Sequence, residues 1–74
     1  MSIFMVDQNK LIVTLHRDDC SILPGDQLKA LKNGEIVKKD NQSWFCEKDL
    51  DMQKINHMMN GRYWILLLCD NCFN

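Results

Sequence analysis

The chain has 74 residues, a formal net charge of −1, 46% hydrophobic residues and 26% charged residues. We expect one small domain spanning residues 1–74, whose limited core needs support from a metal ion, disulfides, a partner or close packing. Nucleic-acid-binding proteins usually carry an excess of basic residues, and mimics of nucleic acid carry an excess of acidic ones. The near-neutral charge therefore favours a protein or a small molecule as the partner.

The longest apolar run, residues 63–69, is far shorter than the ~20 residues that span a bilayer. The first residues lack both the basic region and the long apolar stretch of a secretory signal peptide. We therefore expect a cytoplasmic protein that does not enter membranes and whose cysteines stay reduced.

Residues 3–6 and 11–15 form the first predicted hairpin. Both runs are apolar, the second is rich in β-branched residues, and the four residues between them are polar. We expect Leu11, Val13 and Leu15 to face the core, because alternate residues of a strand share one face.

A short helix is predicted over residues 27–32, with Asp26 as its N-cap. Leu28 and Leu31 are three positions apart, which places them on one side of the helix. Asn33-Gly34 is suited to positive φ angles and ends the helix. The same pair also fits a type I′ hairpin turn, which ranks second because the two leucines fit helical spacing better than strand alternation.

The second predicted helix is capped by Asp49 and runs to about residue 60. Met52, Ile55 and Met59 form a single apolar stripe on it. Asn60-Gly61 ends this helix with the same residue pair that ends the first one.

Residues 35–39 and 43–46 predict a second hairpin, and residues 61–69 predict a final strand. Because residues 63–68 are apolar at nearly every position, we expect this strand to be central and covered on both faces. The predicted fold is an α+β domain of ββαββαβ order, with a mainly antiparallel sheet of about five strands packed against two short helices.

The four cysteines are the sharpest signal for a binding site. Cys69 and Cys72 have the Cys-x2-Cys spacing with which two thiolates bind one zinc ion. Cys20 and Cys46 would complete a four-cysteine site, and His16 with Cys20 is the alternative second half. Because Cys20 and Cys46 are isolated, the favoured interpretation is that the cysteines are small core residues. We therefore predict no obligatory cofactor, with a structural zinc ion as the alternative.

Signals for catalysis are weak. A thioredoxin-type cysteine pair lies at the N-terminus of a helix, whereas only two residues follow Cys72. His16, Cys20 and the neighbouring Asp18 and Asp19 resemble parts of a nucleophilic site, but a solvated loop contains such residues by default. A short chain also has little room for a substrate pocket of ~300 Å³ or more. We expect no enzymatic activity.

A basic cluster of Lys29, Lys32, Lys38 and Lys39 lies around the first helix and the strand that follows it. Phosphate contacts from these lysines and stacking of a base on Trp44 would suit a nucleic-acid-binding regulator. Lysines also protect exposed strands from pairing with other chains, and nearby acidic residues weaken the positive field. Nucleic-acid binding, with zinc as a stabiliser, is therefore the alternative function.

Four of the six aromatic residues are candidate partner contacts, namely Trp44, Phe45, Tyr63 and Trp64. Strand alternation places the two members of each pair on opposite faces, so one fills the core and the other can serve as an interface anchor. An edge strand offered for pairing would lead to homodimers or to capture of a partner.

The leading hypothesis is a small cytoplasmic interaction module that acts as an accessory or regulatory protein, including as an inhibitor, on a larger protein partner. It rests on the small size, the near-neutral charge, the missing catalytic signatures and the surplus of aromatic residues and methionines.

Overall fold

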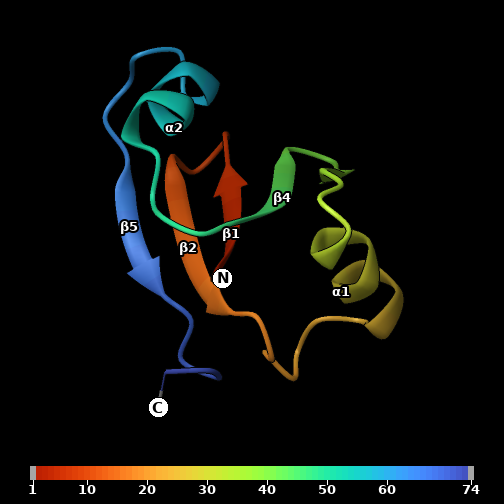
Figure 1. The fold of residues 1–74 in the computed structure, drawn as a ribbon. Coiled ribbons are helices and arrows are strands. Elements are labelled where there is room, and N and C mark those ends of the chain that lie inside the picture. Colours follow the sequence, from red (N-terminus) through yellow and green to blue (C-terminus); the bar gives the residue numbers. More distant parts are fainter. Residues whose placement is uncertain (1, 74) are drawn as a thin grey trace.

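The computed structural model describes residues 2–73 and has the predicted ββαββαβ order, which confirms the α+β fold. Five strands form one mixed sheet in the order β3-β4-β1-β2-β5, and two helices pack on it (Figure 1). The elements are β1 (Ser2–Asp7), β2 (Ile12–Arg17), α1 (Gly25–Lys32), β3 (Val37–Lys39), β4 (Gln42–Glu47), α2 (Met52–Met58) and β5 (Ile65–Leu68).

Strand β1 lies at the centre of the sheet and pairs antiparallel with both β2 and β4. Both predicted hairpins are present, β1 with β2 and β3 with β4. Tight turns connect them, and a residue in each turn adopts a positive φ, 57° at Leu11 and 55° at Asp40. The fifth strand differs in direction, because β5 runs parallel to β2.

Each helix covers a different face of the sheet. Phe4 and Phe45 stack with ring centroids 5.5 Å apart on the face that is covered by Ile55 of α2 and by Met59 at its C-cap. Ile3 follows the opposite face, because neighbouring residues of a strand alternate, and it packs in the cluster formed with α1. The small sheet therefore has two separate cores, an α2-side core and an α1-side core.

The starts of both helices differ from the predictions. Helix α1 begins at Gly25, two residues earlier than predicted, with Pro24 as an N-cap that makes no side-chain hydrogen bond, so Asp26 lies in the first turn instead. Helix α2 is capped by Asp51 and not by Asp49, and the Asp51 carboxylate accepts a hydrogen bond from the Lys54 N–H at 3.1 Å. An aspartate caps α2 as predicted, two positions later in the chain, whereas α1 has no side-chain cap.

The predicted C-terminal ends of both helices and the predicted apolar stripe of α2 are largely correct. Gly34 and Gly61 have φ of 86° and 75°, as a glycine after a helix requires. Asn33 has φ of −83°, which excludes the type I′ turn at this pair. Of the predicted α2 stripe, Ile55 is buried, whereas Met52 in the first turn is 52% exposed.

The predicted position of the last strand is wrong. Residues 63–68 were expected to form a central strand, but β5 lies at the edge of the sheet beside β2 (Figure 1). All four of its residues are exposed, by between 42 and 61%. The helices pack over the central strands and leave β5 uncovered, so its hydrophobicity does not serve the core of this chain.

Candidate metal centre

The parallel pairing of β2 and β5 brings four potential metal ligands to one end of the sheet. Leu15 pairs with Leu68, so His16 in β2 and Cys69 after β5 lie at neighbouring positions. Parallel strands end at the same side of a sheet, and the segments that follow β2 and β5 leave together there (Figure 1). Each segment turns back with a second ligand, Cys20 after β2 and Cys72 after β5.

The ligand atoms of His16, Cys20, Cys69 and Cys72 all lie within 4.8 Å of one another. The Cys20 sulfur is 3.6 Å from Nδ1 of His16 and 3.9 Å from the Cys69 sulfur. The Cys72 sulfur is 3.9 Å from the same imidazole nitrogen. These four residues therefore form a compact group that can hold a metal ion.

The distances match the size of a tetrahedral zinc site. A regular tetrahedron with Zn–S bonds of about 2.3 Å and a Zn–N bond of about 2.0 Å has edges of about 3.5 to 3.8 Å. Three contacts of the cluster span 3.6 to 3.9 Å, close to these edges, and no two ligand atoms are more than 4.8 Å apart. Three thiolates with one imidazole are also a common donor set of structural zinc sites.

Short turns hold the two halves of the cluster in place. In the first, the Cys20 N–H donates to the Arg17 carbonyl at 3.2 Å, and in the second the Phe73 N–H donates to the Cys69 carbonyl at 3.1 Å. The Arg17 guanidinium lies 5.0 Å from the centre of the Phe73 ring, which joins the two segments at the surface.

His16 is 3% exposed, and burial lowers the pKa of its imidazole. The ring is therefore neutral at pH 7, which is the form that binds a metal. Nδ1 faces the sulfurs, so a metal bound there would leave the proton on Nε2, an atom that has no hydrogen-bond partner among residues 2–73. Most metal-binding histidines donate from the second nitrogen, whereas this ring lies against Trp44, with centroids 5.3 Å apart.

The thiols of Cys69 and Cys72 differ in acidity. Burial by itself raises the pKa of Cys69, but hydrogen bonds from the backbone N–H groups of Cys72 and Asn71 and from neighbouring thiols outweigh it and leave the pKa lowered. Burial and the sulfur of Cys20 raise the pKa of Cys72 to about 12. Metal binding must therefore displace protons from the cluster, so affinity is expected to rise with pH.

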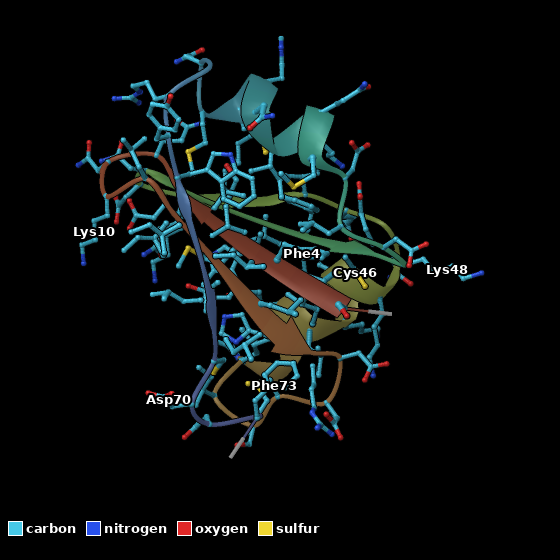
Figure 2. All side chains as sticks on the ribbon, turned by 90° about the vertical axis from the view of Figure 1, so that its left-hand side faces the viewer. Phe4, Lys10, Cys46, Lys48, Asp70 and Phe73 are labelled. Carbon is cyan, nitrogen blue, oxygen red and sulfur yellow. The ribbon has the colours of Figure 1, made fainter. Side chains whose placement is uncertain are left out.

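Cys46 does not belong to this cluster, although it was the fourth cysteine of the predicted zinc set. Ile3 pairs with His16 on one side and with Cys46 on the other. Two strand spacings of about 4.8 Å separate the backbones of His16 and Cys46 by about 10 Å. Figure 2 shows Cys46 well apart from Asp70 and Phe73, which are chain neighbours of Cys69 and Cys72. The fourth potential ligand of the cluster is therefore His16 and not Cys46.

The four aromatic candidates for partner contacts occupy different environments. Phe45 is 3% exposed in the α2-side core and offers no surface to a partner. Trp44 is half-buried against the α1-side core. Trp64 is half-buried in the α2-side core and donates from Nε1 to the Asn56 side chain at 2.6 Å. Only Tyr63, which is 98% exposed, projects fully into solvent.

An exposed apolar surface around β5 was missed by the sequence reasoning. A cleft of about 600 Å³ lies between the start of α2 and the chain leading into β5, and Leu50, Met52, Tyr63 and Leu66 are among its lining residues. A run of apolar residues is normally a sign of burial, so no local signal distinguishes this exposed strand from a core strand.

The four lysines of the nucleic-acid alternative are exposed on two elements that contact each other. Lys29 and Lys32 belong to α1, and Lys38 and Lys39 belong to β3 at the opposite sheet edge from β5.

Comparisons of the chain with protein-family models, with curated proteins and with solved structures each found no match. Within residues 2–73, neither helix has the length and apolar character needed to cross a membrane.

Proposed function

We propose that this chain is a small interaction module that binds a larger cytoplasmic protein as an accessory or regulatory factor, and that a zinc ion stabilises its docking strand. The observation that carries the proposal is the exposure of β5, where four consecutive apolar residues are between 42 and 61% exposed. Exposed apolar patches of this kind mark interaction sites in soluble proteins.

The backbone of β5 supports the same function. Strand β5 is the last strand of the sheet and pairs on one side only, with β2. Natural proteins usually protect such an edge with charged residues or proline, because a bare edge pairs with other chains. Strand β5 contains neither, whereas β3 at the other edge carries Lys38 and Lys39. The two edges therefore differ, and β5 is the one suited to adding a strand from a partner.

Zinc is the metal that fits the cluster of His16, Cys20, Cys69 and Cys72, because it prefers sulfur and nitrogen donors in a closed tetrahedral site. A site closed by four protein ligands has no open position for substrate, which favours a structural over a catalytic role. Bound zinc would join the end of β2 to the end of β5. Reduced thiols are required for this, as they are in the cytoplasm.

Native mass spectrometry of protein purified with zinc tests the metal site. We expect one zinc ion per chain in the wild type and in Cys46→Ser, since Cys46 lies outside the cluster. Cys72→Ser and His16→Ala should each lower the affinity at least about 100-fold, because each removes one of four ligands. A mass of the metal-free chain, with four titratable thiols, would contradict zinc binding.

Capture experiments with two matched baits test the docking surface. Tyr63→Ala combined with Leu66→Lys changes exposed side chains at β5, and Lys38→Ala combined with Lys39→Ala changes the opposite edge. The partner should bind the wild type and the β3 variant, with the affinity of the β5 variant reduced at least about tenfold in titrations with purified partner. Equal binding by both variants would contradict docking through β5.

The same β3 variant tests the nucleic-acid alternative. Four exposed lysines on α1 and β3 favour that function, whereas the net charge of −1 opposes it. Binding that is lost in the β3 variant and falls steeply with salt would support the alternative. The absence of binding to single- or double-stranded nucleic acid at ~50 mM salt would exclude it.

A further inference from the structure

The outer edge of β5 presents backbone groups in a fixed pattern. The Ile65 N–H donates to the carbonyl of Leu11, just before β2, and the Cys69 N–H to the carbonyl of Leu15 in β2, both at 2.9 Å. Because successive backbone groups of a strand alternate in direction, those of Leu66 and Leu68 face away from β2. No strand within residues 2–73 pairs with this outer side.

We propose that a second copy of this chain pairs with the outer edge of β5, antiparallel and with Leu66 opposite Leu66 of the second copy. The inference rests on the proposed use of β5 as a docking strand and names the occupant of that strand when no other partner is present. Two identical strands related by a two-fold axis across a sheet edge run antiparallel, so one surface serves both copies.

Charge complementarity selects the register. In an antiparallel pair, outward-facing residues must lie opposite outward-facing residues, which permits only every second alignment of β5 with its copy. Centring the pair on Leu66 brings Arg62, three residues before β5, to the same end as Asp70 of the second copy, which lies in the turn after β5, and the two-fold axis repeats this ion pair at the other end. The next permitted alignment, centred on Leu67, would instead place Asp70 opposite Trp64.

Arg62 is held where this register needs it. Its Nε donates to the Met59 carbonyl and its Nη2 to the Gln8 carbonyl, both at 3.3 Å. The guanidinium has five N–H donors, so donors remain for a carboxylate. Asp70 is exposed at the opposite end of β5 (Figure 2). Both charges therefore flank the strand and do not interrupt its apolar residues.

The four side chains of β5 lie between the two ion pairs and are all apolar. Leu66 would meet Leu66 of the second copy, and Leu68 would meet Trp64 on the same face. Ile65 would meet Leu67 on the other face. These β5 residues are each at least 42% exposed in the single chain, so pairing would cover surface that neither helix covers. The two sheets would join into one continuous sheet.

Analytical ultracentrifugation of the zinc-loaded full chain tests the proposal. We expect a dimer at about 100 µM that dissociates on dilution. Leu66→Pro removes an N–H that faces away from β2 and should give a monomer, while Leu66→Ala should weaken the dimer without abolishing it. Circular dichroism and zinc content must match the wild type in both variants.

A charge reversal tests the register. Arg62→Glu alone and Asp70→Lys alone each place like charges opposite one another and should weaken the dimer at least tenfold. The double variant should restore it, because the opposite charges meet again with their positions exchanged. In the wild type, the amides of Leu66 and Leu68 should gain protection from hydrogen exchange as concentration rises, whereas that of Ile65 should not change.

A wild-type chain that stays monomeric at about 1 mM would overturn the proposal. So would a dimer that persists in Leu66→Pro, and a double charge variant without recovery would overturn the register. A failure of the dimer proposal can be distinguished from a failure of the proposed function. A monomeric chain whose protein partner binds through β5 would leave that function standing, whereas a dimer with no such partner would leave only self-association.

Discussion

Asp7 closes the turn between β1 and β2 with a single carboxylate oxygen. Its Oδ1 accepts hydrogen bonds from the backbone N–H groups of Lys10 and Asn9, both at 3.0 Å. The hydrogen bond from Lys10 is the main reason that the pKa of Asp7 lies below its ordinary value of 3.8, against the opposing effect of burial. The charged form of this side chain therefore stabilises the hairpin that contains the central strand.

A pH-dependent difference between the wild type and Asp7→Asn follows from this contact. Because the pKa is lowered on folding, the charged form stabilises the protein above pH 3.8, and this contribution disappears as pH falls through the lowered value. We expect Asp7→Asn to be less stable than the wild type at pH 6 by about 1 kcal/mol, and Asp7→Ala by about 1–3 kcal/mol.

Urea unfolding across the range pH 6 to pH 2 measures this effect. The difference between the wild type and Asp7→Asn should shrink toward the acid end, and any acid loss of the metal affects both proteins alike. A difference that stays constant over the whole range would show that the charge of Asp7 contributes nothing.

The cysteines show which metal ligands can and cannot be predicted from spacing in the sequence. The pair Cys69 and Cys72 was identified from its spacing, and it does lie in the cluster. The choice between Cys46 and His16 as a further ligand was left open, since both are distant from that pair in sequence. Strand order decided it, because β1 stands between Cys46 and His16.

At the scale of the element, β5 pairs with β2 along its length, but its side-chain contacts with the rest of the chain lie at its two ends. Trp64 anchors the start through the α2-side core and Asn56, and the metal cluster lies just after the last residue, Leu68. Exposed edge strands of four residues gain little stability from their own packing. Zinc would thus act mainly on the C-terminal end of β5.

Removal of zinc should loosen this end locally. After chelation, we expect the amide of Cys69, bonded to the Leu15 carbonyl, to exchange at least about tenfold faster, equivalent to ~1.4 kcal/mol. The amide of Ile65, at the end anchored by Trp64, should change less. Hydrogen exchange followed by nuclear magnetic resonance, at a concentration where the chain is monomeric, measures both.

Two variants control for effects of the chelator itself. Cys72→Ser without chelator should resemble the metal-free wild type, and Cys46→Ser should respond to the chelator as the wild type does. A uniform loss of protection that includes the amides of β1 would show that the metal supports the whole fold and not one end of β5.

At the scale of the whole molecule, 74 residues form two small cores on opposite faces of one sheet. Neither core includes the side chains of β5, which are exposed on both faces of the strand. A chain of this size is marginally stable from its core alone, so a metal at one end and a partner at one edge are suitable supplements. The two proposals of zinc and self-pairing place both supplements on β5.

The sequence by itself determined the order of the elements, the fold class, both hairpins and the glycines that end the helices. These features depend on local periodicity and on backbone angles that few residues adopt, so neighbouring residues are enough to specify them. Only the tertiary structure decided that β5 is a parallel edge strand and that His16 joins the three cysteines. An apolar run has the same local pattern in a central strand and at an uncovered edge, and strand order depends on contacts between residues far apart in the chain.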